Sequence, residues 1–417
     1  MKLHKKVSFV ISFCIFVLAT SSQLVAQATE REFIYTANFA DNTVSGFSLN
    51  PVTGIATEVL GSPFGSGIGP ASITHSPDGR FIYAVMSSQF LGGPCGINNG
   101  ELLSYSVNPR TGVLTEVDDV RLSGVCSTGI AIDSTGKFVY AASFPGDGPI
   151  KVGIIDGYQT SNGHLIPLPG TPFASPLDVS DGQNPAIEQM AIPPNGEVLY
   201  ASNPNEGRGI LIFDRDTHTG ALAFRTGFDT GTSITPIAIT SSGKFLMALG
   251  DVTLELGLPG VFEFAIGPHG DLTPVPGSPF SIPTNFGGAL AVSPNGEFVD
   301  ITVSGGTDVF HCNARGNLSL TPGSPFPVSG SFSIAFDPDG HFLIGPGSIA
   351  RSNSRTGALT KLPDFTPGGF VTGVTVTKTC EAADEDRDGK RGDRDRHDGD
   401  GKHDSGCSER GNDHGRD

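Results

Sequence analysis

The chain has 417 residues, of which 57 are Gly and 31 are Pro, and it contains no Trp. So many turn-forming residues leave few windows long enough for an amphipathic helix, which favours an all-β fold. The formal net charge is −17 at pH 7, and we expect no nucleic-acid partner because phosphate binding needs a basic face.

Residues 1–28 have the regions of a secretory signal peptide. The basic start MKLHKK is followed by the apolar run VSFVISFCIFVLA and then by VAQA, which predicts cleavage after Ala28. The apolar run is short for a membrane helix, and no second run of spanning length follows it. The sequence therefore predicts an exported protein without a membrane span, located in the periplasm or outside the cell.

One phrase, a tight polar turn followed by an aromatic and β-branched run, recurs along the chain. Its first full copy is SPDGRFIYAV at residues 76–85, a pattern typical of a β-hairpin because Gly supplies a positive φ and the next side chains suit a pleated surface. The turn glycines of the full copies lie 44 to 60 residues apart, the period expected of propeller blades. Further full copies begin at Asp133, Pro193, Thr240, Ser293 and Asp337.

A second turn phrase alternates with the first, beginning with NPVTGIATEVLGSPF at Asn50. Each copy is again a Gly-containing turn that leads into a short strand, so one repeat holds four strands. In the first complete repeat these are ASITHSP, FIYAV, ELLSYSVNP and LTEVDDV. The two phrases together predict a seven-bladed β-propeller built from four-stranded blades.

The two ends of the repeat region are incomplete in complementary ways. REFIYTANF, which begins at Arg31, looks like a second strand without an inner partner, and FVTGVTVTKT, which begins at Phe370, looks like an inner strand without its hairpin. Pairing these two segments would complete one blade and leave no open sheet edge between the chain ends. We therefore expect the N- and C-terminal strands to close the ring.

The phrases SPDGRFIYAV, DNTVSGFSLNPVTG and GSPF resemble the repeats of the lactonase-like seven-bladed propellers of the 6-phosphogluconolactonase type, which are related to the Tyr-Val-Thr-Asn (YVTN) repeat proteins of cell surfaces. The resemblance covers roughly residues 31–378, within a propeller domain that we assign to residues 29–380. A WD-type propeller fits less well because the chain has no Trp. Since propellers host both enzymes and passive binding surfaces, the fold alone does not assign a function.

The mouth of the central channel should be surrounded by the residues seven and eight positions before each turn glycine. The resemblance implies an Arg-His pair there, in a GPRH phrase, and a Glu shortly after the second strand; here the phrase reads GPAS at Gly69, and Met86 and Ser87 occupy the Glu position. A positioned acid or base contributes about 10²- to 10⁴-fold to a rate, so its absence favours binding over catalysis. The pairs, none of which holds Arg or His, are Ala71 and Ser72, Thr128 and Gly129, Glu188 and Gln189, Thr235 and Pro236, Gly288 and Ala289, and Phe332 and Ser333.

Glu188 and Gln189 make one blade the most polar part of this mouth. Arg208 follows the second strand of the same repeat in NPNEGRG, and a carboxylate beside a guanidinium can orient a sugar or an organic acid. The alternative is a surface ion pair that closes a loop, since exposed pairs are common and individually weak.

Five cysteines remain after removal of the signal peptide, so at least one is unpaired or pairs outside the chain. Cys95 in SSQFLGGPCGINNG and Cys126 in RLSGVCSTG should both lie at the mouth in the same repeat. We predict a disulfide between them, worth about 3 to 4 kcal/mol in the loop-entropy model. The pairing of Cys312, Cys380 and Cys407 stays open.

No standard metal or hydrolase motif is present. The chain contains no HExxH, GxSxG or GxxxxGK[ST]. The spacing of His75 and His341 offers no ligand cluster, and single histidines on strands are usually packed or solvent-facing rather than part of a metal site. We therefore expect no resident cofactor in the propeller.

Residues 381–417 form a segment of different composition, with 13 acidic and 8 basic side chains and almost nothing apolar. Such a segment cannot offset its ordering entropy by burial, which predicts a disordered tail. Within it Asp384, Asp386, Asp388 and Asp395 occupy positions 1, 3, 5 and 12 of a calcium-loop pattern. Against calcium binding, the last ligand is Asp rather than Glu and no flanking helices are evident, so a solvated polyampholyte spacer is the alternative.

These observations predict an exported, monomeric propeller that acts as a binding or scaffold module. Its partner would be a small molecule, a carbohydrate or a component of the cell envelope. The alternative function is a lactone hydrolase of the lactonase family whose catalytic groups have moved.

Overall fold

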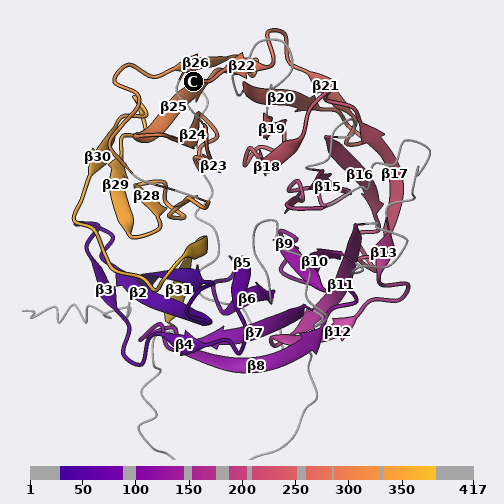
Figure 1. The fold of residues 1–417 in the computed structure, drawn as a ribbon, viewed down its shortest axis with the longest axis vertical. Helices are drawn as coiled ribbons and strands as arrows, with labels where there is room; N and C mark the ends of the chain where they lie inside the picture. The colour runs from indigo at the N-terminus through magenta and orange to yellow at the C-terminus, as the bar shows by residue number, and fades with distance from the viewer. Residues whose placement is uncertain are drawn as a thin grey trace, which may run out of the picture. The chain divides into compact units, whose positions relative to one another are not determined.

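The computed structural model describes residues 29–87, 100–144, 153–174, 187–203, 209–250, 260–283, 286–328, 330 and 332–381. Within these residues every regular element is a β-strand, and no helix there has the length and apolar character to cross a membrane. Residues 30–381 form one compact unit, in which seven antiparallel sheets surround a common centre (Figure 1). The all-β, seven-bladed propeller predicted from the repeats is confirmed.

The first complete blade has the strands and the order expected from its sequence. It consists of β5 (Pro70–His75), β6 (Phe81–Met86), β7 (Glu101–Val107) and β8 (Leu114–Arg121), paired in that order from the centre outward. The turn of the first phrase connects β5 to β6, in register from His75 opposite Ile82. The turn of the second phrase connects β7 to β8, where Val107 lies opposite Leu114.

Five further blades repeat this plan. Their strands, from the centre outward, are β9 (Cys126–Ile132), β10 (Phe138–Phe144), β11 (Ile154–Ser161) and β12 (His164–Pro167); β14 (Met190–Ala191), β15 (Val198–Ser202), β16 (Ile210–Arg215) and β17 (Leu222–Phe228); β18 (Ile234–Ile239), β19 (Phe245–Gly250), β20 (Gly260–Ile266) and β21 (Leu272–Pro274); β23 (Phe286–Val292), β24 (Phe298–Val303), β25 (Gly306–Cys312) and β26 (Leu318–Leu320); and β27 (Ala335–Phe336), β28 (Phe342–Gly345), β29 (Ser348–Ser352) and β30 (Leu359–Lys361).

The seventh blade, hereafter the closing blade, joins the two ends of the repeat region. Its order is β31 (Val371–Glu381), β1 (Thr29–Asn38), β2 (Thr43–Leu49) and β3 (Ala56–Glu58), with β31 innermost. The Phe39 amide donates to the Phe370 carbonyl at 3.0 Å, and the Thr379 hydroxyl donates to the Arg31 carbonyl at 3.4 Å. Figure 1 shows the yellow C-terminal strand beside the indigo N-terminal strands. The predicted closure by shared strands is therefore confirmed.

The phrase GSPF adds an outer pairing that the repeat analysis did not assign. After the fourth strand, the chain returns to the third strand through β4 (Phe64–Gly65), β13 (Phe173–Ala174) and β22 (Phe280–Ser281), which pair with β2, β11 and β20. The hydroxyl before the proline accepts a hydrogen bond from an amide of the third strand, as at Ser62 from Gly46 (3.1 Å) and at Ser278 from Glu263 (2.9 Å). Where the fourth strand is short, this return segment thus supplies partners for third-strand amides that would otherwise be unpaired.

The core lies between neighbouring blades. One buried cluster, for example, joins Phe33 and Tyr35 of the closing blade to Ile82 and Tyr105 of the next. At each junction the glycine of an outer turn packs on a side chain of the preceding blade's second strand, so closely that a Cβ atom would clash with that side chain. The seven pairs are Gly112 with Phe33, Gly163 with Phe81, Gly220 with Phe138, Gly270 with Val198, Gly316 with Phe245, Gly357 with Phe298 and Gly54 with Phe342.

Candidate functional site

A cavity of about 160 Å³ lies where six of the seven blades meet at the centre. Its lining includes Ser72, Gln189, Pro236, Ala289 and Ser333. Five of the six residue pairs that the sequence places at the channel mouth contribute to it. The turn spacing therefore located the inner ends of the blades correctly, and the cavity is the candidate site.

The sixth pair, Thr128 and Gly129, joins two blades instead of lining the cavity. The Thr128 hydroxyl donates to the Ile187 carbonyl at 2.7 Å. A Cβ atom at position 129 would clash with the Glu188 carbonyl. This close approach fixes the backbone that carries Glu188 and Gln189.

Gln189 lines the cavity, and the residue before it, Glu188, has a half-buried carboxyl side chain. The Ser202 amide donates to the Gln189 carbonyl at 2.8 Å, and the Gln189 amide donates to the Ser202 hydroxyl at 2.9 Å, so β15 holds this segment. Burial raises the pKa of Glu188, while a hydrogen bond from the Thr235 side chain opposes that shift. Glu188 is thus a partly desolvated acid whose chain neighbour lines the cavity.

An aromatic cluster forms one side of the same mouth. The Phe332 ring lines the cavity and lies 5.5 Å from the Phe370 ring, which lies 6.4 Å from the Phe39 ring in an edge-on arrangement. Phe370 is 44% exposed. Phe332 is among the mouth residues predicted from the sequence, whereas Phe39 and Phe370 are not, because only ring closure brings them together.

The Glu position implied by the family resemblance is filled by buried residues. Met86 and Ser87 are both fully buried, Met86 belongs to an apolar cluster, and the Ser87 amide donates to the Gly69 carbonyl at 2.8 Å. These two residues hold the GPAS segment in place and present no acid to the channel.

The two histidines singled out in the sequence have different surroundings. The Nδ1 atom of His75 lies 2.7 Å from the Thr375 hydroxyl, and burial lowers the pKa of His75 to about 4, so its ring is neutral near pH 7. His341 is not isolated: ligand atoms of Asp337, Asp339 and His341 all lie within 4.8 Å of one another. The spacing of the two histidines predicted no cluster, but the structure brings these three ligand-type groups together at His341.

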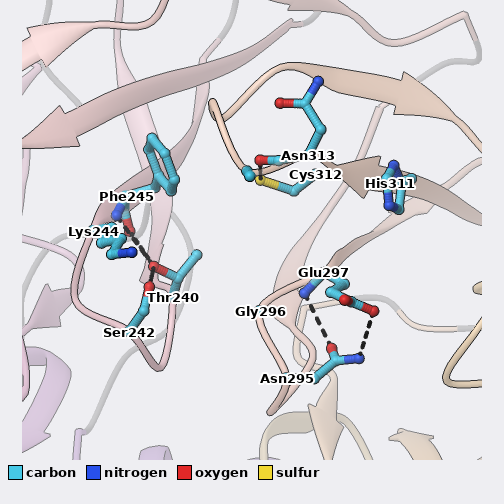
Figure 2. Close-up of a pocket in the computed structure, with 11 residues that line it drawn as sticks. Thr240, Ser242, Lys244, Phe245, Asn295, Gly296, Glu297, His311, Cys312 and Asn313 are labelled. Atoms are coloured by element: carbon cyan, nitrogen blue, oxygen red, sulfur yellow. Dashed lines mark hydrogen bonds between the residues drawn. The ribbon is translucent and has the colours of Figure 1, made fainter. Parts of the chain in front are cut away.

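A second cavity, of about 330 Å³, lies on the turn side between the β18–β21 and β23–β26 blades (Figure 2). Two pairs of its polar side chains are hydrogen-bonded to each other, Thr240 with Ser242 at 3.2 Å and Asn295 with Glu297 at 3.1 Å. Cys312 also lines it, 3.5 Å from the Glu263 carboxyl group. Burial, with that carboxyl group, raises the pKa of Cys312 to about 12, so the thiol is protonated and a weak nucleophile.

Several predicted residues lie outside the described part of the chain. These are the signal peptide, Arg208, Cys95 and the four tail residues Asp384, Asp386, Asp388 and Asp395. Cys126 and Cys380 are disulfide-bonded, and Cys312 is free. The pairing of Cys95 with Cys126, the Arg208 contact and the calcium loop stay predictions.

Comparisons with known proteins point to the same architecture. The family model described as "Lactonase, 7-bladed beta-propeller" matches residues 64–163. No curated protein matches the chain.

Many solved structures share the fold. A protein of Bacteroides uniformis, described as "a putative 6-phosphogluconolactonase", is 18% identical, with a TM-score of 0.66 over 84% of this chain and 99% of that one. The periplasmic gluconolactonase of Pseudomonas aeruginosa is 17% identical, with a TM-score of 0.66 over 84% and 99%. A protein of Lactobacillus plantarum is 13% identical, with a TM-score of 0.63 over 84% and 99%. At such identities, these structures establish the fold and not the activity.

Proposed function

Because the chain is a lactonase-like seven-bladed propeller, we propose that it binds a small sugar lactone at the central cavity and hydrolyses it. The proposal rests on the polar lining of that cavity by Ser72, Gln189 and Ser333, from three different blades. The half-buried Glu188 directly precedes Gln189 in the chain. The names of the matching family model and of the structural relatives support a lactone as the substrate class.

Lactone hydrolysis needs a base for the attacking water and donors for the carbonyl oxygen. Water adds to the carbonyl carbon, the ring C–O bond breaks, and the ring oxygen takes up a proton to give the open hydroxy acid. A Glu with a raised pKa suits the removal and return of this proton near neutral pH, and Glu188 has that property. The Gln189 side chain can donate to the developing oxyanion, and the Ser72 and Ser333 hydroxyl groups can bind the sugar hydroxyl groups.

Binding without turnover is the second candidate function. It is favoured by the lack of Arg and His in all six residue pairs at the mouth, where the family resemblance implies an Arg-His pair. In this case the cavity and the Phe332, Phe370 and Phe39 cluster would hold a small molecule or a carbohydrate, two of the partner classes predicted from the sequence.

One experiment on the purified protein distinguishes the two functions. Proton release from a panel of aldonolactones, including 6-phosphogluconolactone, measures turnover, and calorimetry with the same lactones and their acids measures binding. We expect Glu188→Gln to lower kcat by about 10²- to 10⁴-fold with little change in KM. Glu101→Gln is the control, because Glu101 also has a raised pKa but belongs to β7, the third strand of its blade, whereas Glu188 is the chain neighbour of the cavity-lining Gln189. Binding without proton release would favour the second function. The absence of both binding and proton release would exclude both functions.

We also propose that the protein acts outside the cytoplasm. Residues 1–28 predict export, and the Pseudomonas aeruginosa relative is named as periplasmic. The mass of the protein recovered from its native host should correspond to a chain that begins at Thr29. An intact N-terminus on cytoplasmic protein would contradict this.

A further inference from the structure

Two buried carboxyl groups meet where the β27–β30 blade adjoins the closing blade. Glu32 is 3% exposed and Asp337 is fully buried. Atom Oε2 of Glu32 and atom Oδ2 of Asp337 are both buried without a hydrogen-bond partner. Leaving ionised oxygen atoms buried and unpaired is costly, so such groups point to a missing positive charge or proton.

The surrounding side chains supply further ligand atoms. Asp337, Asp339 and His341 belong to the turn region between β27 and β28, and their ligand atoms lie within 4.8 Å of one another. The Phe342 amide donates to Oδ1 of Asp337, which leaves Oδ2 directed elsewhere. From the closing blade, Glu32 lies close enough to Asp337 and Asp339 that burial, together with the charges of these two groups, raises its pKa. Three ligand-type groups of one blade thus cluster, and a buried carboxyl group of the closing blade lies beside them.

The basic side chain at this site does not balance the charge. Lys378 of β31 lies 2.7 Å from Glu30 and 3.0 Å from Asp339. One ammonium group therefore faces the four carboxyl groups of Glu30, Glu32, Asp337 and Asp339. The two oxygen atoms without partners belong to the carboxyl groups that Lys378 does not contact.

Another junction between blades shows how a buried aspartate at this turn position can be paired with a positive charge. Asp133 begins the turn of the β9–β12 blade as Asp337 begins that of the β27–β30 blade, and it is also buried. There, Arg215 of the next blade lies 3.2 Å from Asp133. The corresponding residue of the closing blade is Leu49, the last residue of the third strand. Among the described residues no arginine takes the place of Arg215 at Asp337, and the nearest basic group is the imidazole of His341, whose Nδ1 atom lies 4.0 Å from Oδ2 of Asp337.

We propose that Glu32, Asp337, Asp339 and His341 bind a divalent cation at this junction. Carboxylate oxygens alone suit Ca²⁺ or Mg²⁺, whereas an added imidazole nitrogen favours Mn²⁺ or Zn²⁺. Since Glu32 is in the N-terminal strand and its partners are in the preceding blade, the ion would tie the closing blade to its neighbour. Its role would be to stabilise the ring rather than to take part in the chemistry of the channel mouth.

The test uses the full chain after treatment with a chelator, titrated with MnCl₂ or ZnCl₂ by calorimetry and followed by thermal unfolding. We expect one ion per chain at this site and a rise in Tm on binding. His341→Gln and Glu32→Gln should each weaken this binding at least tenfold and reduce the rise in Tm. His341 has an exposed side chain, so its variant tests the site even if Glu32→Gln fails to fold.

Asp78→Asn is the matched control. Asp78 occupies the position of Asp339 in the β5–β8 blade, and it is not part of the cluster of ligand atoms. Metal that binds equally to the protein and to the double variant Glu32→Gln with His341→Gln would report another site, such as the acidic tail, and would overturn the proposal. Absence of stoichiometric binding would overturn it too, in favour of a proton shared between Glu32 and Asp339.

Discussion

The Tyr35 hydroxyl donates a hydrogen bond of 2.7 Å to the Gly112 carbonyl, 77 residues further along the chain. Tyr35 belongs to the closing blade, and Gly112 lies in the outer turn of the next blade. The same bond joins Tyr140 to Gly220 at 2.7 Å, and a third copy joins Tyr200 to Gly270. The tyrosine of the repeated phrase therefore holds neighbouring blades together, in addition to forming its own strand.

Replacing Tyr35 with Phe should lower the free energy of unfolding by about 1 to 3 kcal/mol, because the Gly112 carbonyl is buried and loses its hydroxyl donor. Urea unfolding measures the change. Tyr105→Phe is the comparison, because the Tyr105 hydroxyl makes a longer bond, of 3.3 Å, to the Gly65 carbonyl. A Tyr35→Phe variant as stable as the parent protein would show that the bond contributes nothing net.

The strands and the ring closure could be predicted from the sequence because they rest on local signals. The turn before Phe81 and the alternation that follows it specify a hairpin without reference to the rest of the chain. The incomplete copies at Arg31 and Phe370 then needed only the rule that sheet edges are paired. The cavity residues Gln189 and Ser333 followed from counting back along the inner strands.

The contacts between blades could not be predicted from the sequence in this way. Glu32 and Asp337 are about 300 residues apart, and each looks unremarkable in its own repeat. Their proximity depends on which faces of two blades pack together, a property of the closed ring. Asp133 in the same turn position pairs with an arginine instead, so the repeat pattern does not distinguish a salt bridge from a cluster of acids.

Arg215→Met should destabilise the protein by about 3 to 5 kcal/mol, because it leaves Asp133 buried without its partner. Arg215 is almost fully buried, and besides Asp133 it contacts the Tyr140 hydroxyl at 2.8 Å and the Gly196 carbonyl at 2.8 Å. Urea unfolding of the variant, of Asp133→Asn and of the double variant gives the coupling energy between the two residues. Additive effects would show that the pair is not coupled.

Glu263→Gln should change how stability depends on pH. Burial raises the pKa of Glu263 from 4.5 to about 7 in the folded protein. Its stabilising contribution is therefore complete below about pH 4.5 and is lost as the pH rises through 7, with an amplitude of about 3 kcal/mol. The variant lacks this loss, so its stability relative to the parent protein should increase between pH 5 and 8 in urea unfolding at a series of pH values. A constant difference across that range would contradict the assignment.

Deleting residues 369–378 should abolish cooperative folding, because it removes the inner strand of the closing blade. That strand buries Val371, Val374 and Val376 in one apolar cluster, and its Thr372 hydroxyl donates to the Pro70 carbonyl of the next blade at 2.7 Å. Without it, β1 becomes an open edge and the ring loses the contacts that join its last blade to its first. Thermal unfolding followed by circular dichroism measures the effect, with deletion of residues 401–410 in the tail as the control of equal length. An unchanged unfolding curve for the first deletion would mean that the ring does not depend on its closing strand.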